Sequence, residues 1–426
     1  MLEKIKISRF KSVYDVELDF GKVNLLIGGN GAGKSNVLEA IGVLSAALRR
    51  GVSNNELSSK GVRLTPPALM KSAFKNLKLP LTLRIEGGFS KDISYTLDLT
   101  ARDDDVSLAF FSEKGSDKGE QIFSRSGSVR NILGKRIKRE LDRYRGIWDQ
   151  AGGAFEFSDD VLKQFDAMAR FAVYAPQTEF LREIKTGTVD NPPIGLHGEG
   201  LASAVASLLT QLSRAAKKKD SDNTFQRIND ALKIVWVPGW ARQVHVDRIQ
   251  SKLKSTVSSS SDGKTVYFVD KYMNEKRNTL SAYDSSEGTL FILFIAILLA
   301  HSESPPIFAI DNIDSALNPS MTRALIENTI NLIKTKAESG VSIGPDQIFM
   351  TSHNPTSLDA FDLFDPDQKV FVVARDDKGR TTATPLRPIA GMTRLDWDRA
   401  MKGKSLSQFW IDGDIKGALG IDGGSI

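Results

Sequence analysis

One segment of the chain combines the residue types that bind phosphate. Residues 28–35 read Gly-Gly-Asn-Gly-Ala-Gly-Lys-Ser, a full match to the G-x-x-x-x-G-K-[ST] pattern. Glycines at this spacing let successive backbone N–H groups surround a phosphate, while Lys34 reaches the β- and γ-phosphates and Ser35 helps to hold Mg²⁺. The segment predicts a nucleoside triphosphate site that contains Gly28, Asn30, Gly31, Gly33, Lys34, Ser35 and Asn36.

The residues around this loop are those that its mechanism requires. The apolar run 23–27 before it reads as a strand, and 37–41 after it reads as the start of a helix. A helix that begins at the loop adds partial positive charge from its N-terminus.

Two further polar groups follow apolar strands. Asp311 comes after 307–310 and can hold Mg²⁺ through water at the carboxyl edge of a parallel sheet. His353 comes after 348–350 and can hydrogen-bond a γ-phosphate or orient a water. A single acid or histidine is commonly structural, but the order strand, phosphate loop, strand, Asp, strand, His favours a functional role for both.

A polar segment precedes the longest apolar run of the chain. Residues 285–289 read Ser-Ser-Glu-Gly-Thr, in which Ser286 suits a helix N-cap and Gly288 allows close backbone approach. The run at 290–300 is too short to span a bilayer, so it predicts a buried helix. The first residues alternate like the edge of a sheet and lack the apolar core of a signal peptide.

Composition excludes several kinds of site. The 426 residues are 41% apolar and include no cysteine and four histidines, which excludes disulfides and thiolate sites and argues against a multi-histidine metal site. The absence of cysteine fits a cytoplasmic protein. The net charge of +5 permits nucleic-acid contact without demanding it.

The remaining pattern predicts the elements that position these groups. Alternating strands and helices from residue 289 onward imply a parallel sheet wrapped by helices. We expect an antiparallel hairpin at 81–99, a loop at 112–128, a helix at 129–145, mainly helices at 197–237, a flexible turn at 255–263, strands at 307–310, 347–351 and 369–374, a helix at 321–338 and a small helical cap at 402–420.

Together these motifs resemble the ABC-type ATPases of the SMC/RecF/OLD group. The matching segments are 7–13 at the start, 28–35 as Walker A, 286–289 as the signature motif, 307–311 as Walker B, 316–319 as the D-loop and 351–353 as the H-loop. The resemblance implies an α/β ABC-ATPase head with a mixed sheet, a parallel P-loop core, an antiparallel β subdomain and a helical insertion. We expect an N-terminal lobe at 1–100, an insertion at 101–280 and a C-terminal lobe at 281–426.

The resemblance also implies a mechanism. Heads of this class bind two ATP molecules between two copies arranged head to tail, so that Ser286 and Gly288 of one copy contact the γ-phosphate held by the other. Gln177 would take a Q-loop position near Mg²⁺. ATP and Mg²⁺ are the implied cofactors, and a dimer or a higher oligomer is the implied assembly.

One position departs from the family pattern. After the Walker B aspartate the family places a glutamate that activates water, and this chain has Asn312, whose amide does not accept a proton at neutral pH. Three explanations remain open. Hydrolysis is slow, or Asp314 or His353 replaces the base, or the asparagine is an engineered change.

Basic residues and the family suggest partners. Residues 129–145 are rich in Arg and Lys, and Lys217 to Lys219 form a second basic spot, which fits either phosphate-backbone binding or a solvated surface. The sequence holds no nuclease constellation. We expect an ATPase that controls a separate effector, such as a nuclease or toxin, in bacterial phage defence. The alternatives are a RecF-like repair ATPase that binds DNA and an ATP-bound scaffold with little turnover; no membrane partner is expected.

Overall fold

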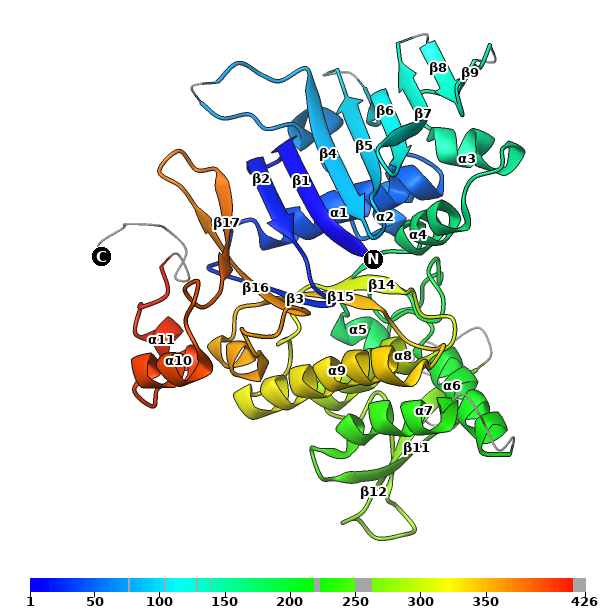
Figure 1. The fold of residues 1–426 in the computed structure, drawn as a ribbon. Helices are drawn as coiled ribbons and strands as arrows, with labels where there is room; N and C mark the ends of the chain where they lie inside the picture. The colour runs from blue at the N-terminus through cyan, green and yellow to red at the C-terminus, as the bar shows by residue number, and fades with distance from the viewer. Residues whose placement is uncertain are drawn as a thin grey trace.

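The structure is a computed structural model that describes residues 1–75, 77–102, 105–127, 129–138, 140–217, 223–249 and 263–416. Two large sheets enclose one helix, and further helices cover the outer face of the sheet that carries β3 and the phosphate loop (Figure 1). This arrangement confirms the α/β fold class of an ABC-type ATPase head, with a P-loop core and an antiparallel β part.

The sheet that carries the phosphate loop is mostly parallel. Its strand order is β10-β14-β15-β3-β16-β17, and only β17 runs antiparallel to its neighbour. These strands are apolar because helices or the other sheet cover both faces. Their bounds are β3 Val23–Ile27, β10 Val173–Tyr174, β14 Ile307–Ile310, β15 Gln347–Ser352, β16 Gln368–Arg375 and β17 Thr381–Leu386.

The second large sheet is antiparallel throughout. Its order is β2-β1-β4-β5-β6-β7-β8-β9, so β1 lies inside the sheet and the expectation that the first residues form an edge is wrong. The strands are β1 Leu2–Phe10, β2 Val13–Asp19, β4 Thr82–Phe89, β5 Ile93–Thr100, β6 Ala109–Asp117, β7 Glu120–Ser126, β8 Val129–Ile132 and β9 Lys135–Arg136.

Helix α1 (Lys34–Arg49) lies between the two sheets (Figure 1). The side chains of β3 divide between two cores: Leu25 packs with the outer helices and Leu26 packs with α1 and the antiparallel sheet. Because α1 starts at Lys34, both cores fix the position of the phosphate loop.

The helices on the outer face include the buried helix expected from the sequence. Helix α8 (Glu287–Ala300) is buried from Thr289 to Ala300, and α9 (Pro319–Ser339) covers the same core. The other helices and 3₁₀ turns are α2 Asn54–Ser59, η1 Pro67–Met70, α3 Ile147–Ala151, η2 Gly152–Ala154, α4 Asp159–Ala169, α5 Thr178–Leu181, α6 Leu201–Lys217, α7 Thr224–Lys233, η3 Ile234–Trp236, η4 Pro355–Ala360, α10 Arg394–Met401 and α11 Leu406–Ile411. A small antiparallel sheet joins β11 Ala241–Arg248, β12 Lys264–Asp270 and β13 Thr279–Ser281.

The helix expected at 129–145 is wrong. That segment forms β8, a turn and β9, followed by an irregular stretch. Leu133 and Gly134 have φ angles of 46° and 74°, which end any helix and reverse the chain, and β8 pairs with β7. Pairing with the preceding strand β7, which ends at Ser126, overrides the helical spacing of the apolar residues.

The loop expected at 112–128 is also wrong. It forms the hairpin of β6 and β7, which turns at Lys118 and Gly119. Glu113 on β6 and Arg125 on β7 occupy inward positions and form a buried ion pair of 2.5 Å. A charged residue at an inward position conceals the alternation that identifies a strand in sequence.

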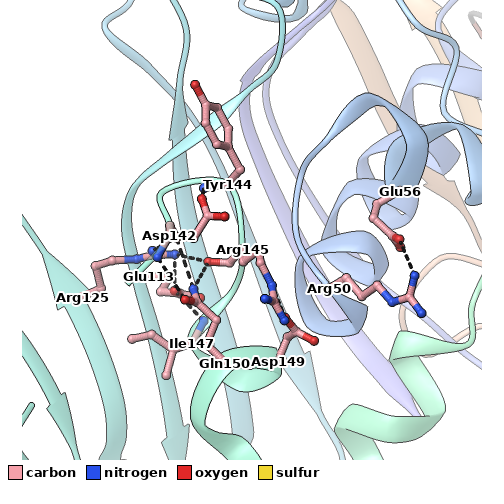
Figure 2. Close-up of polar contacts among 10 residues, drawn as sticks. All are labelled: Arg50, Glu56, Glu113, Arg125, Asp142, Tyr144, Arg145, Ile147, Asp149 and Gln150. Carbon is pink, nitrogen blue, oxygen red and sulfur yellow. Dashed lines mark hydrogen bonds and ion pairs between the residues drawn. The ribbon is translucent and has the colours of Figure 1, made fainter. Parts of the chain in front are cut away.

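This ion pair also holds the irregular stretch that follows β9 (Figure 2). Arg125 donates to the carbonyls of Asp142 and Arg145, and Glu113 accepts the N–H of Ile147 at 2.9 Å. The same stretch contacts the end of α1, because Val52 donates its N–H to the carbonyl of Tyr144.

The other expected elements are confirmed over the residues that the structure describes. They are the hairpin at 81–99, the helices within 197–237, the helix at 321–338 and the strands at 307–310, 347–351 and 369–374. The cap at 402–420 contains α11, in which Trp410 is buried. Several predicted segments lie partly outside the described residues: 417–420 of the cap, Arg139, Lys218, Lys219, and all of the turn at 255–263 except Gly263. The three-part division at residues 100 and 280 stays a prediction.

No helix in the described part of the chain has the length and apolar character needed to cross a membrane.

Candidate nucleotide site

The phosphate loop connects β3 to α1 and is shaped by its glycines. Gly28 and Gly33 have φ angles of 143° and 111°, which side chains rarely allow. A Cβ on Gly28 would lie 2.0 Å from the carbonyl oxygen of Val373, and one on Gly33 would lie 2.2 Å from Oγ1 of Thr381. Only glycine fits at these two positions, because the hairpin of β16 and β17 packs directly against the loop.

The amino group of Lys34 lies inside the loop. It donates to the carbonyls of Gly28 at 2.8 Å and Gly29 at 3.1 Å, and it lies 3.3 Å from Nδ1 of His353. Burial lowers the pKa of Lys34 to about 8, and the nearby charges of Asp311 and Asp314 partly oppose that shift. The two carbonyls therefore hold the Lys34 ammonium group at the position where the sequence pattern predicts that phosphate binds.

Asp311 follows β14 and uses both carboxylate oxygens. The Ser35 hydroxyl donates to Oδ2 at 2.9 Å, and the Thr351 hydroxyl donates to Oδ1 at 2.5 Å. Strands β14, β15 and β3 are adjacent and parallel, so their carboxyl ends bring these three residues together.

Asn312 has a φ angle of 59°, in the left-handed region. Asparagine is among the few residues other than glycine that adopt this conformation readily, whereas glutamate is not. The backbone N–H of Asn312 donates to the Thr351 hydroxyl at 2.8 Å, which fixes the peptide beside Asp311.

Asp314 and His353 lie beside each other. The backbone N–H of His353 donates to Oδ2 of Asp314 at 3.0 Å, and Oδ1 of Asp314 is buried without a hydrogen-bond partner among the described residues. Burial lowers the pKa of His353, and the charge of Lys34 lowers it further, more than the neighbouring carboxylates raise it. His353 is therefore a weak proton acceptor, while Asp314 has a free oxygen.

Of these groups, Lys34, Asn312 and His353 line a cavity of about 280 Å³, whereas Asp311 and Asp314 lie behind its lining. The sequence analysis did not find two arginines that line it, Arg63 and Arg375. Arg375 ends the apolar strand β16 at the carboxyl edge of the parallel sheet, a position that could have marked it. The cavity is lined by Asn30, Gly31, Gly33, Lys34, Ser35, Asn36, Arg63, Asn312, His353 and Arg375.

A larger cavity of about 890 Å³ lies elsewhere, beside Trp148 and Arg170. It mixes arginines with acids and includes none of the phosphate-loop residues. The smaller cavity is therefore the better candidate for a triphosphate.

The predicted signature residues do not line the nucleotide cavity. Ser286 is exposed and caps α8, accepting the N–H of Thr289 at 3.3 Å. Gly288 packs against the D-loop, where a Cβ would lie 2.8 Å from the carbonyl oxygen of Ala316. These two residues therefore do not contribute to the cavity of their own chain.

Gln177 is exposed and precedes α5. Its backbone N–H donates to the carbonyl of His197, and its side chain does not line the cavity. It follows β10, which is parallel to β14, so it lies beyond the same edge of the sheet as Asp311.

The site has the donors that a Mg²⁺–triphosphate needs. The phosphate loop supplies backbone N–H groups and Lys34 supplies a cation. Ser35 and Asp311 supply adjacent oxygens of the kind that Mg²⁺ prefers.

Three solved structures align with most of the chain. The SMC head domain from Thermotoga maritima is 13% identical, with a TM-score of 0.43, over 91% of this chain and 99% of that one. An SMC head bound to the C-winged helix domain of ScpA is 16% identical, with a TM-score of 0.46, over 92% and 99%. The recombination mediator protein RecF is 14% identical, with a TM-score of 0.33, over 91% and 98%.

No curated protein matched the sequence. One family profile, described as "AAA domain, putative AbiEii toxin, Type IV TA system", matches residues 23–359. The match runs from β3 through the phosphate loop, Asp311 and His353 to η4, and it includes most of the chain. The chain therefore belongs to this AAA-domain family.

Proposed function

We propose that the protein binds ATP with Mg²⁺ and uses it to hold two copies together, and that this assembly controls a separate effector. The observation that carries the proposal is that Lys34 and Ser35 line one cavity at the carboxyl edge of the parallel sheet, with Asp311 hydrogen-bonded directly behind Ser35. Charge-assisted hydrogen bonds from these groups would bind the triphosphate.

Ser35 and Asp311 are the proposed Mg²⁺ ligands, with Gln177 as a further one. The metal would neutralise phosphate charge as it accumulates in the transition state. Ser35 already donates to Asp311, so the two oxygens are placed without a large rearrangement.

Asp314 is the proposed proton acceptor for the attacking water. Both oxygens of Asp311 are occupied, and the lowered pKa of His353 makes that side chain a poor base. Oδ1 of Asp314 is buried and unpartnered within the described structure. The Asn312 amide can orient water but not deprotonate it, so we propose slow hydrolysis, because general-base catalysis contributes about 10²–10⁴-fold in rate.

A second copy would complete the site. Ser286 and Gly288 do not line the cavity of their own chain, and Ser286 is exposed at the start of α8. In a head-to-tail pair, the Ser286 hydroxyl and the first N–H groups of α8 would meet the γ-phosphate bound by the other copy.

The proposed setting is bacterial antiviral defence in the cytoplasm, with a nuclease or toxin as the effector. The description of the family refers to a putative toxin of a type IV toxin–antitoxin system, which supports a role in a system of two proteins. Co-purification of an effector with the protein from its native operon, in the presence of ATP, tests this part of the proposal.

A DNA-repair role remains the second candidate. The observation in its favour is the exposed basic hairpin of β8 and β9, where Lys135, Arg136 and Lys138 are exposed. Cations that neutralise DNA phosphates give salt-dependent binding. DNA binding that is strong at low salt and weakened by Arg136→Glu, but not by Lys276→Glu in the loop between β12 and β13, would favour this candidate.

The mass of the assembly tests the central proposal. With ATP and Mg²⁺ we expect a species of twice the 46.8 kDa chain mass, and a single-chain mass without nucleotide. The Lys34→Ala variant should keep the single-chain mass both with and without ATP. A wild-type mass that does not respond to ATP would contradict the proposal, and phosphate release equal to a protein-free blank would favour the scaffold alternative.

A further inference from the structure

Arg375 is attached to the phosphate loop from the far end of the chain. Its Nε donates to the carbonyl of Gly31 at 2.9 Å, and one of its terminal nitrogens donates to the carbonyl of Gly379 at 2.7 Å. The first bond joins residues 344 positions apart. The guanidinium is therefore held between the loop and the turn that connects β16 to β17.

These two bonds leave donors unused. A guanidinium has five N–H donors, so three remain beside the cavity that Arg375 lines. In the described part of the chain Arg375 forms no ion pair, whereas Arg63, the other arginine of the cavity, pairs with Glu39. Lys34 also forms no ion pair among the described residues, so the cavity contains two cations that no carboxylate contacts directly.

The two cations contact different parts of the loop. Lys34 donates to Gly28 and Gly29, whereas Arg375 donates to Gly31. Thr381 donates its hydroxyl to the next carbonyl, that of Ala32, at 2.8 Å. The β16–β17 hairpin thus occupies the carbonyls of Gly31 and Ala32, and Lys34 occupies those of Gly28 and Gly29.

We propose that Arg375 binds a phosphate group of the nucleotide held by its own chain, in addition to Lys34. The proposal rests on the nucleotide site proposed above and adds a second cation to it. The planar fork of the guanidinium suits two phosphate oxygens at once, which a lysine at this place could not match. Because Arg375 also donates to Gly379, its side chain connects the bound phosphate to the β16–β17 hairpin.

Binding of ATP and of inorganic tripolyphosphate, each with Mg²⁺, tests the proposal by calorimetry. Arg375→Ala should weaken both ligands about 10- to 100-fold, the loss expected for hydrogen bonds to a charged group. Arg375→Lys should recover part of that loss, since it keeps the charge but not the fork. The slope of log Kd against log salt should decrease in Arg375→Ala.

Two comparison variants separate this role from others. Arg380→Ala removes a nearby arginine that stacks on Tyr14, and it should bind both ligands as the wild type does. Thr381→Val removes a neighbouring contact to the loop without changing charge, and it measures what weaker support of the loop costs. Thermal unfolding without ligand shows whether each variant is folded.

The binding results distinguish a failure of the Arg375 contact from a failure of the nucleotide site itself. Wild-type affinity in Arg375→Ala, or an equal loss in Thr381→Val, would overturn the phosphate contact. A loss for ATP with none for tripolyphosphate would also overturn it, because the contact would then be to the nucleoside. If the wild type binds neither ligand, or Lys34→Ala binds both normally, the nucleotide site itself is wrong, and not only the role of Arg375.

Discussion

At the proposed nucleotide site, Lys34 should make binding sensitive to pH. Its pKa of about 8 without ligand lies below the usual lysine value of 10.5 because the amino group is buried. Phosphate favours the charged form, so above pH 8 binding must take up a proton, and affinity falls as pH rises. Below about pH 7 the Lys34 amino group is already charged, so it adds no pH dependence to the affinity.

We therefore expect the ATP affinity of the wild type to decrease between pH 8 and 9.5, with a limiting slope of about tenfold per pH unit. Lys34→Arg binds more weakly but keeps its charge, so its affinity should not depend on pH in this range. Calorimetry at a constant salt concentration measures both. A wild-type affinity that is flat up to pH 9.5 would contradict the lowered pKa.

In the proposed reaction, Asn312 and Asp314 set the rate of hydrolysis. Asp314→Asn should lower steady-state phosphate release about 10²-fold or more, because it removes the proposed base. Asn312→Glu has to place glutamate at a φ of 59°, at a cost of about 1 kcal/mol, so it should speed turnover less than a restored base normally would.

The same assay separates the explanations for Asn312. If Asp314→Asn turns over like the wild type while Asn312→Glu is about 100-fold faster, the chain simply lacks a base and Asp314 has no part in the reaction. ATP binding, measured on both variants, controls for damage to the site.

At the scale of the elements, the start of α8 has a structural role as a capped helix end and a proposed role in ATP-dependent assembly. Ser286 caps the helix, and Ser158 caps α4 through the same contact, accepting the N–H of Val161 at 3.3 Å. Replacing either serine with alanine should cost about 1 kcal/mol of stability by denaturant unfolding. Only Ser286→Ala should also prevent the ATP-dependent increase in mass, and loss of assembly in Ser158→Ala as well would show that the effect is one of general stability.

The buried ion pair of β6 and β7 supports the stretch that contacts α1 (Figure 2). Arg125→Met leaves Glu113 charged and buried, so we expect a loss of about 3–5 kcal/mol in denaturant unfolding and easier proteolysis at 140–147. Adding Glu113→Gln should recover most of the loss, since it removes the charge and keeps an acceptor for the Tyr95 hydroxyl. A loss below 1 kcal/mol in the single variant would contradict a structural role for the pair.

Local patterns predicted the core elements, whereas pairing between neighbouring strands and one contact across the whole chain decided the rest. The phosphate loop, the buried helix α8 and the strands that end at Asp311 and His353 depend on residues close in sequence, so pattern alone located them. The helix expected at 129–145 failed because β8 pairs with β7, and the loop at 112–128 failed because Glu113 and Arg125 neutralise each other inside the sheet. Arg375 was missed because its partner, Gly31, lies at the other end of the chain.

At the scale of the whole molecule, the phosphate loop lies where the two sheets, α1 and the C-terminal hairpin meet (Figure 1). The first fifty residues supply the loop, and residues after 300 supply Asp311, His353 and Arg375. The signature residue Ser286 does not line this cavity. The account therefore predicts that one chain holds an incomplete site and that two chains hold two complete ones.

Mixing two inactive variants tests this claim most directly. Lys34→Ala and Ser286→Ala should each stay at single-chain mass with ATP and Mg²⁺, because every site in either homodimer lacks one group. In an equal mixture, Lys34 of one variant and Ser286 of the other form one intact site, so we predict a species of twice the 46.8 kDa chain mass. A mixture that stays at single-chain mass, while wild type at the same concentration doubles, would contradict the shared site.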